Sequence, residues 1–144
     1  KAYSFTALVF MVLLAGISSS IHFVILSVSR QIEFDELPGL SLFFSFKWPS
    51  VVYALDILAW DWFFALSMLC AAPVFNRGKL EKIVQILMIV SGVLSLAGLI
   101  GVPLADMQVR NIGVLGYGVV APVVFLLLGL VFGRTQLGEG EIDR

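Results

Sequence analysis

Four long runs of apolar residues, separated by shorter polar segments, dominate the chain. They cover residues 5–28, 51–75, 83–104 and 112–132. Each run is close to the ~20 residues that a helix needs to cross the hydrocarbon core of a bilayer. The pattern predicts an all-α, polytopic membrane protein, with residues 1–144 forming a single domain of four transmembrane helices.

The connections between these runs indicate how the helices are arranged. Residues 76–82 and 105–111 form short connections, which force neighbouring helices to run antiparallel, so the simplest arrangement is an up-down bundle. The tail over residues 134–144 is polar and contains glycine, and we expect it to be mobile.

The first connection differs from the other two because it is long and partly aromatic. Residues 40–48 are rich in phenylalanine but too few to span a bilayer. Aromatic rings together with Lys47 suit the level of the lipid headgroups, where the apolar part of each side chain contacts lipid and its polar end contacts water. We therefore predict an interfacial aromatic segment in this first outer loop.

Composition supports a membrane protein and argues against some partners. Hydrophobic residues make up 60% of the chain, charged residues only 13%, and the mean hydropathy is +1.03. Soluble domains typically have about 45–50% apolar and about 25% charged residues. The net charge of -1 gives no basic surface for a nucleic acid, so the predicted partner is the lipid bilayer.

The distribution of basic residues predicts the orientation. Six of the nine lie at the chain ends or in the middle connection (Lys1, Arg77, Lys79, Lys82, Arg134 and Arg144), and three lie on the other side (Arg30, Lys47 and Arg110). The positive-inside rule then places both termini in the cytoplasm, with the protein in a plasma or inner membrane.

Small residues spaced four apart mark candidate helix-packing faces, because lipid-embedded helices associate by close backbone approach. The pairs are Gly16 with Ser20, Ser91 with Ser95 continuing to Gly98, and Gly129 with Gly133. They fit either packing within the bundle or contact with a second copy or a larger membrane partner. Gly113, Gly116 and Gly118, followed by Pro122, predict a loosened fourth helix.

Three ionisable residues lie inside the predicted spans: His22, Asp56 and Asp61. A charge near the bilayer centre costs at least ~2.5 kcal/mol, so such residues need a partner or a function. His22 and Asp56 both lie roughly 8 Å below the outer boundary, at about 1.5 Å per residue. The α-helical period places Asp56 and Asp61 about 140° apart, which predicts that they cannot face one small centre.

Two interpretations of these residues remain open. In the first, His22, Asp56, Tyr117 and Arg110 line an outward-opening polar cavity, with Asp61 deeper. In the second, the polar side chains satisfy one another as interhelical glue.

Three functional classes follow from these alternatives. The first is a structural or accessory subunit that acts through helix–helix contacts. The second is a small oligomeric transporter or channel that uses Asp61 and Asp56 with His22. The third is a membrane enzyme or lipid-headgroup binder, for which the sequence offers no catalytic motif. A single histidine and the lone Cys70 predict no metal site and no cofactor.

Overall fold

The computed structural model describes the backbone of residues 1–31 and 39–142, and side chains as far as Arg134. The described residues are mostly helical, with short non-helical connections, and contain no strand. Four helical spans are long and apolar enough to cross a membrane: Ala2–Ser29, Val51–Val74, Lys79–Gly101 and Met107–Arg134.

Each span is one nearly continuous helix made of several elements. The first consists of α1 (Ala2–Val24) and the π-helical turn η1 (Ile25–Ser29). The second consists of α3 (Val51–Ile57), η2 (Leu58–Phe63), α4 (Phe64–Ala71) and η3 (Ala72–Val74). The third consists of α5 (Lys79–Gly98) and η4 (Leu99–Gly101). The fourth consists of α6 (Met107–Val114), η5 (Leu115–Val120) and α7 (Ala121–Ile142).

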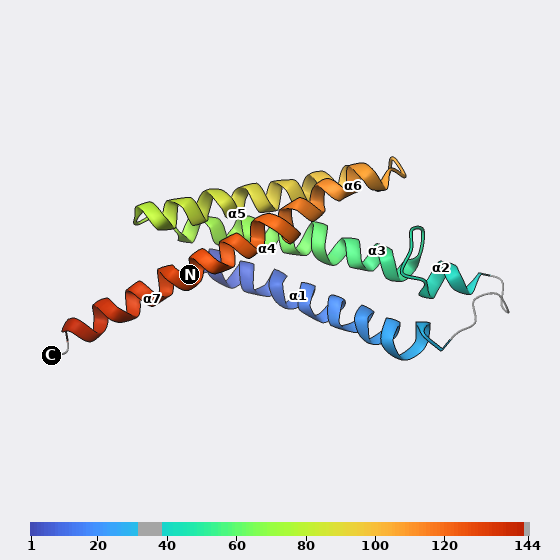
Figure 1. The fold of residues 1–144 in the computed structure, drawn as a ribbon, viewed down its shortest axis with the longest axis horizontal. Coiled ribbons are helices and arrows are strands. Elements are labelled where there is room, and N and C mark those ends of the chain that lie inside the picture. Colours follow the sequence, from blue (N-terminus) through green and yellow to red (C-terminus); the bar gives the residue numbers. More distant parts are fainter. Residues whose placement is uncertain (32–38, 143–144) are drawn as a thin grey trace.

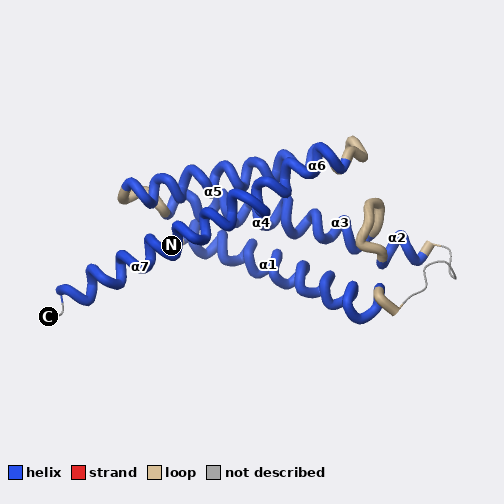
Figure 2. The backbone as a smooth tube through the Cα atoms, viewed as in Figure 1, coloured by secondary structure: helices blue, strands red, loops and turns tan. Residues whose placement is uncertain are grey.

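Successive spans run back and forth along the long axis of the molecule (Figure 1). α1 runs towards the short helix α2 (Leu40–Phe44), α3 and α4 return, α5 runs forward again, and α6 and α7 lead back to the end where the chain began. The loops lie at the two ends (Figure 2). We call the end that carries α2 the α2 end.

The main contacts follow the order of the chain. α1 packs on α4 and η2, α4 packs on α5, and α5 packs on α6, η5 and α7. α7 extends beyond the other helices at its carboxyl end (Figure 1). The first and last spans are therefore the outer members of the assembly.

Capping residues explain where two of the helices begin. The fourth was predicted to start at residue 112, but it starts at Met107 because the Asp106 carboxylate accepts hydrogen bonds from the backbone N–H groups of Gln108 (2.8 Å) and Val109 (3.2 Å). Ser50 caps α3 in the same way, since its hydroxyl accepts from the N–H of Tyr53 at 3.1 Å. The fourth helix also continues to Ile142, past the predicted end at residue 132, because no proline follows to stop it.

The surface is apolar along most of the length of the molecule. α1 buries only Ala7, Leu14 and Ile21, one residue in every seven. The exposed side chains of the first span include large hydrophobic groups (Phe5, Leu8, Val12, Phe23 and Leu26), and α7 exposes a similar set (Val123, Phe125, Leu126, Leu130 and Phe132). Apolar surface on this scale is unfavourable in water and suits a lipid environment.

Glycines bring the backbones of α5 and the fourth span into direct contact. A Cβ atom at Gly98 would lie 2.7 Å from the backbone nitrogen of Gly113, and one at Gly116 would lie 2.6 Å from the carbonyl oxygen of Ser91. The Ser91 hydroxyl donates a hydrogen bond to the carbonyl of Gly116 at 2.8 Å. Small residues thus let two helices approach closely enough for side chain to bond backbone.

Adding a methyl group at this contact should loosen the bundle. We expect Gly98→Ala and Gly116→Ala each to lower the free energy of unfolding by about 1–3 kcal/mol, because the backbone has to shift to admit the new atom. Gly118→Ala is the matched control, since the nearest atom to its Cβ is a side-chain carbon of Val114 at 3.5 Å. It should gain up to about 1 kcal/mol from helix propensity. Unfolding in detergent, followed by circular dichroism, measures both; equal effects at Gly98, Gly116 and Gly118 would contradict the close contact.

Candidate functional site

A buried ion pair joins the second and fourth spans near the α2 end. Arg110 Nη2, from α6, lies 3.2 Å from Asp61 Oδ2, from η2. The Asp61 side chain is fully buried and Arg110 is 5% exposed. Apart from this ion pair, Arg110 Nε and both Asp61 oxygens have no hydrogen-bond partner among the described residues.

A glycine makes room for this pair. A Cβ atom on Gly113 would overlap Oδ1 of Asp61, so α6 can lie against η2 at this point only because the residue has no side chain. Gly113 stands three positions after Arg110, on the same face of the helix. The Arg110 side chain and the Gly113 gap together admit the Asp61 carboxylate.

Aromatic rings surround the guanidinium group. Its central carbon lies 5.6 Å from the centre of the Tyr53 ring and 5.9 Å from that of Tyr117. Tyr117 in turn contacts the rings of Trp60 (5.2 Å) and Phe64 (6.3 Å). These rings exclude water from the charges, and the two tyrosines offset part of the desolvation cost through cation–π interaction.

Asp56 lies next to the pair without contacting it directly. Its side chain is 9% exposed and its Oδ1 has no hydrogen-bond partner among the described residues. It is close enough to His22 and Arg110 to interact with their charges. It therefore adds a second carboxylate to a site that holds one guanidinium group.

A π-helical turn lies between the two aspartates and changes their relative phase. An α-helix would separate Asp56 and Asp61 by about 140°, as expected from the sequence. Residues Leu58–Phe63 form the π-turn η2, in which hydrogen bonds run from i to i+5, so the angle between the two side chains is smaller than in a regular α-helix. Among the described residues Arg110 forms an ion pair with Asp61 alone, so the expectation that the two carboxylates do not face one centre stays a prediction.

His22 stays apart from the cluster. Its side chain is exposed, and its Nδ1–H donates to the carbonyl of Ser18 on the same helix at 2.7 Å. No ion pair or hydrogen bond joins it to Asp56 in the described part of the chain. Of the five residues predicted to line a cavity, the structure thus brings together Asp61, Arg110 and Tyr117, places Asp56 beside them, and leaves His22 outside.

The sequence did not single out Tyr53, Trp60 and Phe64, and it named Gly113 only as a residue that loosens the fourth helix. Tyr53 lies three positions before Asp56, and Trp60 directly precedes Asp61. Aromatic residues so near a buried charge were a usable signal. Gly113 was visible as a small residue three positions from Arg110. Its role depends on the facing helix, which no local pattern specifies.

The described residues contain no group of three or more histidine, cysteine or acidic side chains that could hold a metal ion. No protein-family model, curated protein or solved structure matches this chain. The function therefore has to be inferred from the geometry of the chain itself.

Two double-mutant cycles should separate the direct pair from the neighbouring charges. Asp61→Asn and Arg110→Gln should each lower the free energy of unfolding by about 3–5 kcal/mol, because each leaves one buried charge without its partner. The double variant should lose much less than the sum. The cycle of His22→Ala with Asp56→Ala should show a much smaller coupling, because no hydrogen bond or ion pair joins these side chains in the described residues.

Both cycles are measured by unfolding in detergent, with Arg77→Gln as the control for loss of an exposed cation. Additive losses at Asp61 and Arg110 would show that the ion pair does not hold the two spans together.

Proposed function

We propose that this chain is an integral membrane protein whose four spans cross the bilayer in an up-down-up-down order, and that it acts as a structural or accessory subunit. Both termini would lie in the cytoplasm of a plasma or inner membrane. The proposal rests on three features of the described residues: the apolar outer surface, the enclosed charges, and an unoccupied packing motif on α7.

The enclosed ion pair favours a structural role over transport. A proton or cation pathway needs water or a mobile ion at the carboxylate, yet Asp61 is 0% exposed and faces Arg110 within a ring of aromatic side chains. Buried polar contacts of this kind commonly hold membrane helices together. The same argument applies to Ser67, whose hydroxyl donates to the carbonyl of Ala7 at 2.9 Å and ties α4 to α1.

The observation that carries the proposal is the free face of α7. Gly129 and Gly133 are exposed, and a Cβ atom built on either would meet nothing within 4 Å. Leu126 and Leu130 flank them and are 73% and 57% exposed. A Gly-xxx-Gly pair with large apolar neighbours is the pattern by which membrane helices dimerise, and none of the described residues packs against this pair.

Chemical labelling tests the bilayer placement. In a Cys70→Ala background, a membrane-impermeant thiol reagent applied to intact cells should label Leu104→Cys, and should label Asn76→Cys only after permeabilisation. Val90→Cys, at the middle of the third span and 40% exposed, should resist the reagent in both conditions because lipid covers it. Labelling of Val90→Cys in folded protein would overturn the membrane assignment, and the reverse pattern at the two loops would invert the orientation.

Self-association in vesicles tests the α7 face. Energy transfer between donor- and acceptor-tagged copies should be strong for the native chain and should fall for Gly129→Ile and Gly133→Ile, because a branched side chain prevents close backbone approach. Val123→Ile is the control, since it adds bulk to an exposed position about 120° around the same helix from Gly129. Transfer that is absent in the native chain, or unchanged in both glycine variants, would argue against assembly of copies through α7.

A further inference from the structure

An apolar groove runs along one side of the molecule between the first and second spans. It has a volume of about 270 Å³. The lining residues are Gly16, Ile17, Ser20, Ile21 and Val24 of α1, and Val52 and Leu55 of α3. Ser20 adds no free polar group, because its hydroxyl donates to the carbonyl of Gly16 at 2.8 Å. A Cβ atom on Gly16 would meet nothing within 4 Å, so the floor of the groove is open.

The length of the groove matches one leaflet of a bilayer. Gly16 lies at the middle of the span Ala2–Ser29, and Val24 lies eight residues, or about 12 Å, nearer the α2 end. Half of a ~30 Å hydrocarbon core is about 15 Å. A groove for a partner's transmembrane helix would continue through both leaflets, whereas one that begins at the midplane suits a single acyl chain.

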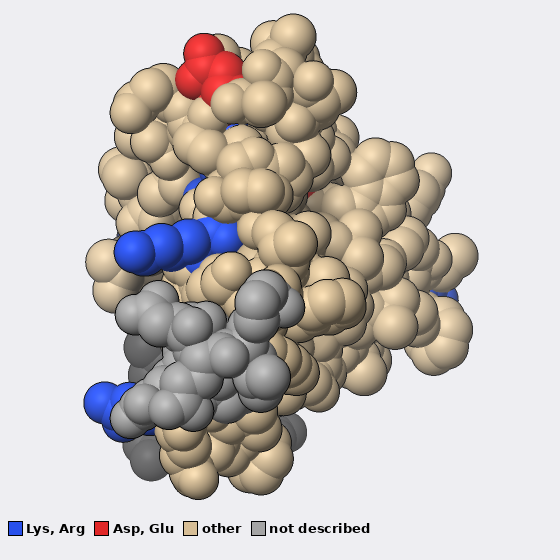
Figure 3. All heavy atoms as spheres, turned by 90° about the vertical axis from the view of Figure 1, so that its right-hand side faces the viewer, with Lys and Arg blue, Asp and Glu red and all other residues tan. Residues whose placement is uncertain are grey.

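A second pocket lies at the α2 end, between the end of the first span and residues 41–47. Ser29, Ser41, Phe44, Ser45, Phe46 and Lys47 line it, and its volume is about 440 Å³. Lys47 is exposed and makes no ion pair with any described residue, and the Ser29 hydroxyl is buried without a partner among them. Basic side chains are exposed on this end of the molecule (Figure 3). An ammonium group and a hydroxyl donor, with no carboxylate among the lining residues that the structure describes, fit the phosphate of a lipid headgroup.

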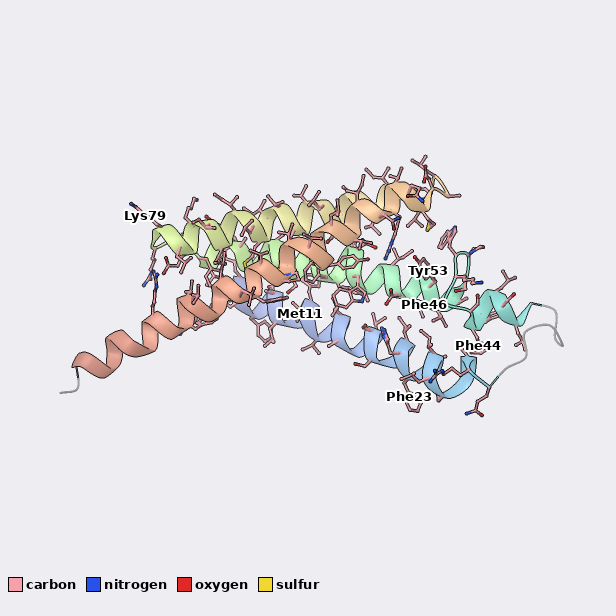
Figure 4. The ribbon with its side chains drawn as sticks, in the orientation of Figure 1. Met11, Phe23, Phe44, Phe46, Tyr53 and Lys79 are labelled. Carbon is pink, nitrogen blue, oxygen red and sulfur yellow. The ribbon has the colours of Figure 1, made fainter. Side chains whose placement is uncertain are left out.

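Phe46, which lines the pocket, lies near both α1 and α3, the two helices that line the groove. Its ring lies 6.5 Å from that of His22 on α1 and 5.2 Å from that of Tyr53 on α3. Figure 4 shows Phe46 and Tyr53 together at the α2 end, while Phe23 points away from the bundle and Lys79 lies at the opposite end. Ser29 follows Val24 by five residues, which is about 7.5 Å along the helix. This distance suits the separation between the headgroup end of an acyl chain and the phosphate of the same lipid.

We propose that the groove and the pocket together bind one anionic phospholipid of the leaflet at the α2 end. Its acyl chain lies between α1 and α3, and its phosphate lies beside Lys47 and Ser29. The inference rests on the bilayer placement proposed above but not on the association through α7, which uses a different face.

Retention of defined lipids tests the site. The full chain is reconstituted in vesicles of phosphatidylcholine with a minor fraction of phosphatidylglycerol, extracted in mild detergent and weighed by native mass spectrometry. One phosphatidylglycerol per chain should remain bound. The double variant Gly16→Leu/Ser20→Leu should lose it, because the new side chains fill the groove, while Ser19→Leu on the same helix but outside the groove should retain it.

Two charge substitutions, one inside the pocket and one outside it, test the headgroup contact. Lys47→Gln should reduce the preference for phosphatidylglycerol over phosphatidylcholine by about fivefold, the effect of about one basic residue near an anionic lipid. Arg30→Gln, an exposed cation at the same end but outside the pocket, should leave the preference unchanged.

Three outcomes overturn the proposal: no lipid retained by the native chain, retention that survives filling of the groove, or a preference that survives Lys47→Gln. If the double variant does not fold, Leu55→Phe narrows the groove from the α3 side and should also expel the lipid. Failure of the bilayer placement itself would look different, because the chain would then leave the vesicles without detergent.

Discussion

The close contact between α5 and the fourth span is the constraint on which the rest of the structure depends. Gly98 and Gly101 of the third span face the backbone of Arg110, and Gly116 faces the backbone of Ser91. Side chains at these glycines would hold α6 away from α5, and the Arg110 guanidinium would then not reach Asp61. A buried charge without its partner is strongly destabilising. The glycine contact and the ion pair therefore depend on each other.

The sequence predicted the four spans well because each depends on one strong signal, a run of about 20 apolar residues. It also singled out Asp61, Asp56 and Arg110, since ionisable residues beside lipid are costly. It could not predict the partner of each charge. The π-turn at Leu58–Phe63 changes the phase of Asp61 relative to Asp56 and has no reliable sequence signal. The Asp106 cap, which places Arg110 in a helix, was detectable from its residue type.

The small-residue pairs show why a local motif does not identify its partner. Ser91, Ser95 and Gly98 face the fourth span inside the bundle, whereas Gly16, Gly129 and Gly133 have open space in front of them. All three pairs have the same spacing. Only the tertiary arrangement separates a motif that packs within the chain from one that is left for a lipid or another helix.

The two ends of the molecule carry different kinds of interaction, and this difference bears on how a lipid is accommodated. The ion pair ties the second span to the fourth and does not include α1. α1 is held by the hydrogen bond from Ser67 to Ala7, towards the end opposite α2, and by packing on α4 and η2. The α2 half of α1 can therefore stand off from α3 and line a groove without separating any buried charge from its partner. A bound acyl chain there would replace missing helix–helix packing, at no cost to the polar cluster.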